Sequence, residues 1–198
     1  MLPYVPAGAL AILEVGCSSG EFGNAVKAQQ PTEYWGIEPV VEAAVAETKL
    51  DRVLRGDIER DEFNFPADYF DCSVFNDVLE HLADPWAVLK RLRHNLKPGG
   101  VVIASIPNVR HHEVIKDLLH KADWQYVEEG VLDRTHLRFF TKLSIATLFG
   151  DCGYEIIKTD GINGTKLPWQ FALLNVFFGG AWADMQFSQF ACVARKSP

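Results

Sequence analysis

The amino-acid sequence predicts an α/β fold, in which a mainly parallel sheet is covered by helices on both of its faces. Short apolar runs alternate along the chain with stretches of helical character, and this alternation is typical of strand–helix–strand units. The length of 198 residues fits one domain, and contents of 48% hydrophobic and 23% charged residues are ordinary for a globular chain. We therefore expect residues 1–198 to form a single domain.

The first half of the chain supplies the clearest alternation. The apolar run 9–15 ends at a Gly/Ser-rich turn and suits a buried parallel strand, and residues 21–29 have helical character. Residues 34–38 are predicted to form a second strand, 40–49 a second helix and 52–57 a short third strand.

The second half begins with a fourth predicted strand at 70–75. Asp84 and Pro85 then predict a helix start, because Asp can cap free N–H groups and Pro fits the first helical position. This helix is expected to reach about Leu96 and to stop at 97–100, which is Lys-Pro-Gly-Gly. Further apolar runs predict strands at 101–105, 154–158 and 187–194.

The turn after the first strand has the pattern acidic-x-Gly-x-x-x-Gly, from Glu14 through Gly16 to Gly20. Glycines allow a tight turn and a close approach of the backbone to a ligand. The dinucleotide pattern G-x-G-x-x-G is not met, because Ser18 and Glu21 occupy two of its glycine positions. This disfavours a nucleotide-dependent oxidoreductase. A strand–helix turn without a ligand is the alternative interpretation.

Two acidic residues follow the next predicted strands. Glu38 ends the second strand, where a carboxylate can accept hydrogen bonds from both hydroxyls of a ribose. Asp57 lies at the end of the third strand and can accept from an adenine amino group, while the backbone N–H of Ile58 binds a ring nitrogen. A solvated loop acid and a simple turn residue are the respective alternatives.

A further motif, residues 76–82, follows the fourth strand and is expected to line the junction of cofactor and acceptor. His81 is the best single candidate for a general base, because the unperturbed pKa of histidine lies near neutrality. A structural or cofactor-contacting role of His81 is the alternative to a general base. Spacing alone does not distinguish Glu80 and His81 from residues of a helix terminus.

The segments 12–20, 56–58, 77–82 and 96–100, in this order, resemble the class I S-adenosylmethionine-dependent methyltransferases. The resemblance covers about residues 9–160 and implies a Rossmann-like seven-stranded sheet in the order 3-2-1-4-5-7-6. It also implies S-adenosylmethionine as cofactor and S-adenosylhomocysteine as product, with Glu14 orienting the loop or the cofactor ammonium. The implied cofactor contacts are Glu14, Gly16, Cys17, Ser18, Gly20, Glu38, Pro39, Asp57, Ile58, Asn76, Asp77, Val78 and His81.

The acceptor side is expected in segments 105–112 and 130–141, which are polar and aromatic at once. The sequences of these two segments are similar to those of methyltransferases found with bacterial glycosyltransferases and surface-polysaccharide genes. Phosphate or sugar hydroxyls could meet these side chains. Alternatively, Asp133 and Arg134 pair in a structural turn, and Phe139 and Phe140 belong to the core. The candidate acceptor contacts are Asn108, Arg134, His136 and Arg138, and the candidate bases besides His81 are His111, His112 and His136.

Composition disfavours several partners. A net charge of −7 and a pI near 5.3 argue against nucleic acid. The apolar stretch 167–183 is too interrupted for a membrane span. The four cysteines form no C-x-x-C pair, so a reducing, cytoplasmic setting is expected. No metal site is predicted, because the four histidines His111, His112, His120 and His136 show no i, i+4 pair and no cysteine partners at zinc spacing.

These observations predict methyl transfer to a small-molecule or saccharide acceptor, at oxygen. The alternative is a cofactor-binding partner or regulatory protein without transferase activity, because the first strand begins near Ala9 and leaves no helices ahead of it to cap an acceptor pocket. Segments 107–140 and 162–186 are therefore expected to form the acceptor side or a lid. The apolar stretch 167–178 would cover the acceptor pocket or form a homodimer contact, with an ordinary buried helix as the alternative.

Overall fold

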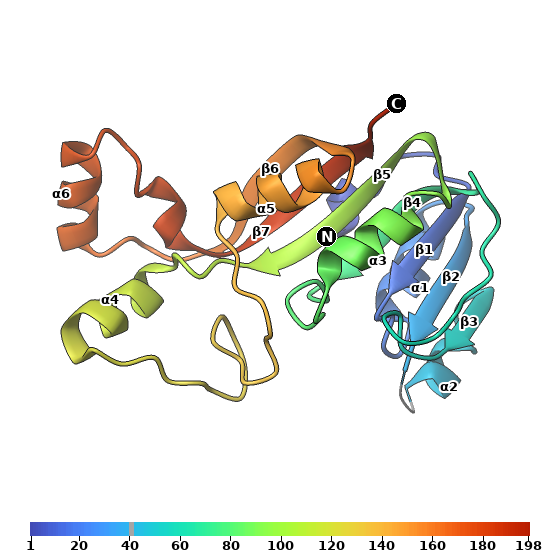
Figure 1. Ribbon diagram of the computed structural model, residues 1–198, viewed down its shortest axis with the longest axis horizontal. Helices are drawn as coiled ribbons and strands as arrows, with labels where there is room; N and C mark the ends of the chain where they lie inside the picture. The colour runs from blue at the N-terminus through green and yellow to red at the C-terminus, as the bar shows by residue number, and fades with distance from the viewer. Residues whose placement is uncertain (40–41) are drawn as a thin grey trace.

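The computed structural model describes residues 1–39 and 42–198. Its centre is a seven-stranded sheet in the order β3-β2-β1-β4-β5-β7-β6, which confirms the predicted order (Figure 1). Neighbours among β1 to β5 pair in parallel, and β7 runs antiparallel to both β5 and β6. The strands are β1 (Ala11–Val15), β2 (Glu33–Glu38), β3 (Arg52–Arg55), β4 (Phe70–Asn76), β5 (Leu96–Pro107), β6 (Tyr154–Gly164) and β7 (Phe187–Lys196).

Helices cover both faces of this sheet, as predicted. Successive side chains of a strand point to opposite faces, so Ile12 and Leu13 of β1 enter two separate apolar clusters. The Ile12 cluster is closed by α1 and α2, and the Leu13 cluster by α3 and α5, which lie in front of the sheet in Figure 1. The helices are η1 (Leu2–Tyr4), α1 (Glu21–Gln29), α2 (Ala43–Ala46), α3 (Pro85–Leu92), α4 (His112–Lys121), α5 (Lys142–Asp151), α6 (Trp169–Phe177) and η2 (Ala183–Gln186).

Helix α3 begins where the sequence predicts and ends earlier. The Asp84 carboxylate caps it by accepting from the N–H of Ala87 at 3.0 Å. The expected end at Leu96 was wrong, because Leu96 is fully buried and pairs with Phe70 as the first residue of β5. Sheet pairing therefore extends β5 back through the Lys-Pro-Gly-Gly segment, which the sequence predicts only as a helix stop.

Two other elements differ in length. The helix expected at 40–49 is the short α2, and its first two expected residues lie outside the described part of the chain. Strand β3 ends at Arg55 rather than 57, which leaves Gly56 and Asp57 in the loop beyond the sheet edge. That position is where the carboxyl ends of parallel strands present their loops to ligands.

The two segments expected on the acceptor side meet each other beyond the sheet. Arg110 Nη2 lies 3.2 Å from Asp184 Oδ1, and the rings of His112 and Phe171 are 6.1 Å apart. Helices α4 and α6 thus lie together at the end of the molecule opposite β2 and β3 (Figure 1).

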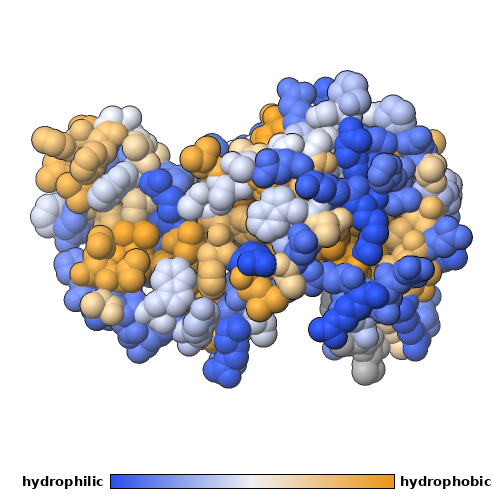
Figure 2. All heavy atoms as spheres, in the orientation of Figure 1, coloured by the Kyte–Doolittle hydropathy of each residue, from blue (hydrophilic) through white to orange (hydrophobic). Residues whose placement is uncertain are grey.

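Helix α6 is apolar and exposed. None of its residues is buried, and Phe177 is 87% exposed, so the alternative of an ordinary buried helix was wrong. Figure 2 shows apolar side chains gathered over this end of the molecule. Among the described residues, no helix has both the length and the apolar character needed to cross a bilayer.

Candidate active site

A cavity of about 280 Å³ lies at the carboxyl ends of β1, β2, β3 and β4. Its position is the one expected for a ligand of a sheet of this kind. Most of the expected cofactor contacts line it, together with residues that the sequence did not single out, such as Ile37 and Glu59. The lining is Val15, Gly16, Ile37, Glu38, Pro39, Gly56, Asp57, Ile58, Glu59, Asp77, Val78, His81 and Leu82.

Gly16 forms the tight turn at the floor of this cavity. Its φ is +70°, and the N–H groups of Gly16 and Cys17 both donate to the carbonyl of Ile37, at 2.9 and 3.1 Å. A Cβ at this position would lie 2.7 Å from Cγ2 of Val78, which lines the same cavity. Both the backbone conformation and the close approach therefore require glycine.

The Glu38 carboxylate joins the loop to the end of β2. Its side chain is buried, and Oε2 accepts from the N–H of Ser18 at 2.8 Å. Asp57 also lines the cavity, while its Oδ1 accepts from the N–H of Glu59 at 2.8 Å. Asp57 is thus a turn residue that also forms part of the cavity wall, and its contact with an adenine stays a prediction.

Glu14 lies beneath the loop rather than on the cavity wall. The Tyr34 hydroxyl donates to Oε2 and the Asn76 amide to Oε1, each at 3.1 Å. Burial raises the pKa of Glu14 to about 7, and these two hydrogen bonds oppose that rise. Cys17, Ser18, Gly20 and Asn76 likewise do not line the cavity, and burial raises the pKa of the Cys17 thiol to about 12, so this thiol is not a nucleophile.

A second cavity of about 390 Å³ adjoins the first, because Asp77 and His81 line both. Asp77 has a φ of +54°, its N–H donates to Ser105 Oγ at 3.0 Å, and its Oδ1 accepts from Gln189 Nε2 at 2.7 Å. The segment after β4 therefore lies where the two cavities adjoin. The second cavity is lined by Asp77, Glu80, His81, Pro107, Gly130, Val131, Asp133, His136, Asn163, Ser188 and Gln189.

Two of the four candidate bases lie at this second cavity. The rings of His81 and His136 have centroids 4.7 Å apart, and burial lowers the pKa of His136. Beside them lies Glu80, whose pKa burial raises to about 8 and whose Oε1 is 4.0 Å from His136 Nε2. The carbonyl of Glu80 accepts from the N–H groups of Leu137 and Arg138, at 2.8 and 3.0 Å, which fixes the His136 loop against the segment after β4.

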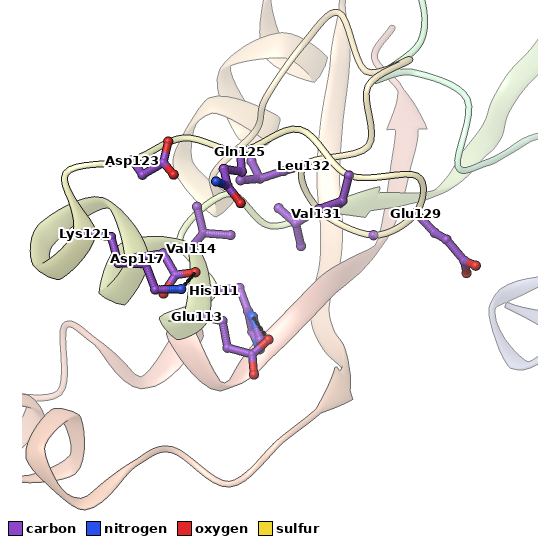
Figure 3. A pocket seen from close by; sticks show the side chains of 12 residues that line it. His111, Glu113, Val114, Asp117, Lys121, Asp123, Gln125, Glu129, Val131 and Leu132 are labelled. Atoms are coloured by element: carbon purple, nitrogen blue, oxygen red, sulfur yellow. Dashed lines mark hydrogen bonds and ion pairs between the residues drawn. The ribbon is translucent and has the colours of Figure 1, made fainter.

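The other two histidines, His111 and His112, do not line the cavity at the carboxyl ends of β1 to β4. His111 and His112 both place Nε2 near Thr165 Oγ1, at 3.3 and 3.0 Å. Burial, and then the neighbouring His112, lower the pKa of His111. His111 lines a third cavity of about 280 Å³ between α4 and segment 123–132, where Asp117 and Lys121 form an ion pair (Figure 3).

Three of the expected acceptor contacts have other roles. Asn108 is fully buried, and its amide donates to the carbonyls of Asp184 and Phe187 at 3.0 and 2.9 Å, so it is structural. Arg134 pairs with Glu128 on the surface, not with Asp133. Arg138 donates to the carbonyl of Ala83. Only His136 of the four expected contacts lines the second cavity.

Sequence reasoning did not assign a role to Glu80 or Glu59. The Glu59 carboxylate accepts from the N–H groups of Ala83 and Asp84, at 3.0 and 2.7 Å, and so joins the turn after β3 to the start of α3. Both roles depend on contacts between distant segments, and no local spacing signals them.

Comparisons with known proteins agree with this geometry. Residues 6–159 match a family described as "Methyltransferase domain". A ubiquinone biosynthesis O-methyltransferase from Cereibacter sphaeroides is 25% identical over 177 residues, which cover 85% of this chain and 70% of that protein.

Two solved structures share the fold. An S-adenosylmethionine-dependent methyltransferase from Mesorhizobium loti has a TM-score of 0.67 at 17% identity, covering 98% of this chain and 94% of that one. The [4+2]-cyclase SpnF also has a TM-score of 0.67, at 18% identity, covering 96% of this chain and 75% of that one. The fold alone thus accommodates more than one chemistry.

Proposed function

This chain belongs to the methyltransferase-domain family and is an S-adenosylmethionine-dependent methyltransferase, and from that premise we propose that it methylates an oxygen of a small-molecule acceptor. The observation that carries the proposal is the meeting of two cavities at Asp77 and His81. One cavity has the residues that fit the cofactor, and the other offers space for an acceptor beside it. The name of the Cereibacter sphaeroides relative supports oxygen as the methylated atom.

The residues of the first cavity suit the cofactor. Gly16 leaves room where a side chain would meet Val78, Glu38 lies at the end of β2 for ribose hydroxyls, and Asp57 with Ile58 borders the expected adenine position. When bound, S-adenosylmethionine supplies an electrophilic methyl group on a sulfonium sulfur, so the protein contributes alignment and exclusion of water.

His81 is the residue we propose as the proton acceptor. Its Nδ1 lies 3.3 Å from the carbonyl oxygen of Thr135 and 3.1 Å from Thr135 Oγ1, so a proton on Nδ1 can donate to the carbonyl. Nε2 then keeps its lone pair and can take the proton of an acceptor hydroxyl as the new oxygen–carbon bond forms and the sulfur–carbon bond breaks. S-adenosylhomocysteine is the second product.

The second cavity has side chains that suit a hydroxylated acceptor. Asn163, Ser188 and Gln189 offer neutral polar groups, and Asp77 and Asp133 offer carboxylates that can accept hydrogen bonds from hydroxyls. A saccharide therefore belongs among the acceptors we propose, together with the link to glycosyltransferase and surface-polysaccharide genes that the sequence resemblance implies. A phenolic acceptor is favoured by the relative's involvement in ubiquinone biosynthesis.

A binding and transfer assay tests the proposal. S-adenosylmethionine and S-adenosylhomocysteine, but not NAD or NADP, should raise the melting temperature, with about 2.7 kcal/mol of stabilisation at a hundredfold excess over Kd. Dihydric phenols and monosaccharides are then screened for methylated products by mass spectrometry.

Two variants show whether transfer depends on the proposed residue. His81→Gln should lower kcat about 10²- to 10⁴-fold. His94→Gln, an exposed histidine in the turn before β5 at the other end of the sheet, should not. Binding of S-adenosylhomocysteine without transfer to any oxygen acceptor would contradict the proposal and favour a cofactor-binding partner or regulatory protein.

We also propose a homodimer or a lid formed through α6, and a location in the cytoplasm. The exposed aromatic residues of α6 support a homodimer or a lid. Four free and buried cysteines support a thiol-reducing compartment.

A further inference from the structure

Glu80, His81 and His136 form a cluster on the wall of the second cavity. One possible ligand atom from each of the three lies within 4.8 Å of the other two. We propose that this cluster binds a divalent transition-metal cation such as Zn²⁺, and that the cation holds the oxygen of the acceptor. The sequence predicts no metal site, a prediction that considers four histidines, His136 among them, and neither Glu80 nor His81. Only the fold brings His136 to these two residues.

The Glu80 carboxylate is the strongest reason for a cation. Its side chain is 1% exposed, and neither of its oxygens has a hydrogen-bond partner among the residues that the structure describes. A buried carboxylate without partners is costly unless it is protonated or a charge of opposite sign compensates it, and a cation that binds here would replace the proton. His136 Nε2 is 4.0 Å from Oε1, which is too far for a hydrogen bond.

The two histidines are oriented as metal ligands usually are. His136 Nδ1 lies 3.1 Å from the carbonyl oxygen of Val131, and His81 Nδ1 lies 3.3 Å from that of Thr135. Protons on both Nδ1 atoms donate to these carbonyls, which leaves both Nε2 atoms with lone pairs. A backbone carbonyl that fixes the tautomer in this way is a recurrent outer partner of metal-bound histidine.

A further carboxylate supports this arrangement from outside. Asp133 Oδ1 accepts from the N–H of Thr135 at 2.7 Å and from its hydroxyl at 2.6 Å. Thr135 is the residue that contacts His81, so Asp133 positions the ring through it. Residues of the 131–138 loop therefore orient both imidazoles.

The donor set indicates the class of metal. Two imidazoles and one carboxylate suit Zn²⁺ and related transition metals, whereas Mg²⁺ prefers oxygen ligands and retains its waters. A tetrahedral cation holds its ligand atoms about 3.3 Å apart, so binding would draw the three side chains together. Three protein ligands also leave one coordination position open, as in catalytic zinc sites.

The proposed role of the cation rests on the proposed function. Because the second cavity adjoins the cofactor cavity through Asp77 and His81, an acceptor oxygen in the open position would lie next to the methyl donor. A bound cation lowers the pKa of such a hydroxyl, whose proton is released to water. His81 is then a ligand of the cation, and its role as proton acceptor applies to the metal-free protein. Metal binding itself can be measured without cofactor or acceptor.

The test uses full-length protein without a histidine tag, stripped with a chelator. Zn²⁺ is titrated by calorimetry and Co²⁺ by its visible absorption, with Mg²⁺ as the comparison ion. We expect one Zn²⁺ per chain, tetrahedral-type Co²⁺ bands and much weaker Mg²⁺ binding. Glu80→Gln and His136→Gln should each weaken Zn²⁺ binding at least tenfold, and His94→Gln should match the wild type.

Calorimetry with S-adenosylhomocysteine, run on the same variants, checks that each is folded. Glu80→Gln retains the size of the buried side chain, and His136→Gln provides an independent variant if the first fails to fold. The proposal is overturned if the wild type binds no Zn²⁺, or if both variants bind Zn²⁺ as the wild type does. Zn²⁺ binding by a protein that does not bind S-adenosylhomocysteine would contradict the proposed function and leave the metal site standing.

Discussion

Gly16 lies where the loop after β1 meets Val78. Its substitution tests whether this loop affects the affinity for the cofactor as well as the stability of the fold. Gly16→Ala places a Cβ 2.7 Å from Val78 Cγ2 and forces alanine to a φ of +70°. We expect the affinity for S-adenosylhomocysteine, measured by calorimetry, to fall at least tenfold. The left-handed conformation should also cost about 1–2 kcal/mol of stability.

A matched control is available in Gly99, which has a φ of +76° and nothing within 4 Å of its Cβ position. Gly99→Ala therefore introduces similar backbone strain without the contact, at the start of β5. It should lower stability and leave the affinity unchanged. Wild-type affinity in Gly16→Ala would show that this loop does not hold the cofactor.

Glu14 makes the stability of the fold depend on pH. Burial raises the pKa of Glu14 to about 7, whereas an unfolded glutamate has a pKa of about 4.3. The folded state therefore holds a proton that the unfolded state releases, so this contribution to stability is complete below about pH 4 and is lost as the pH rises through 7. The loss amounts to roughly 4 kcal/mol.

Glu14→Gln should remove this dependence, because glutamine stays neutral. Asn76 Oδ1 has no partner among the described residues, so it can accept from the new amide. In urea unfolding from pH 4 to pH 8, the stability of the wild type should fall relative to Glu14→Gln. Glu62→Gln, an exposed acid, should follow the wild type. A difference between wild type and Glu14→Gln that stays constant with pH would refute the assignment.

At the scale of elements, α6 is a helix with many apolar side chains, and none of its residues is buried in the core. Phe177 and Phe178 are 87% and 52% exposed. If α6 contacts a second copy, Phe177→Ser together with Phe178→Ser should convert a dimer into a monomer in light scattering. If it closes over the acceptor, the same variant should lose turnover without a change in mass.

Leu143→Ser provides the comparison, since Leu143 on α5 is 78% exposed and lies on another helix. It should change neither the mass nor the turnover. Both proposals for α6 fail if the wild type and the double variant are monomers with equal cofactor binding and equal turnover.

The two ends of α3 show which boundaries local sequence patterns determine and which depend on tertiary contacts. The capping residue Asp84 fixes the start of α3, because the cap is a contact within one turn. The end of α3 depends on β4, since Leu96 pairs with Phe70 and enters the buried sheet. The helix-stop signal at 97–100 therefore lies within β5, which begins at Leu96.

At the scale of the whole molecule, the sheet order explains how residues far apart in sequence share one site. Strands β1 and β4 are neighbours at the centre, so Gly16 and Asp77 meet at one edge. The antiparallel β7 brings Gln189 to Asp77, and the loop after α4 brings His136 to Glu80. The two cavities therefore adjoin each other at Asp77 and His81.

The sequence by itself determined the fold class, the sheet order through family resemblance, and most residues that line the cavity at the carboxyl ends of β1 to β4. These depend on short-range patterns, namely apolar periodicity, a glycine turn and acids directly after strands, which each segment carries on its own. Only the tertiary structure decided that Asn108 is structural, that His111 and His112 do not line this cavity, and that Glu80 lies beside His136. These facts depend on the paths of long loops and on burial, and neither leaves a regular spacing in the chain.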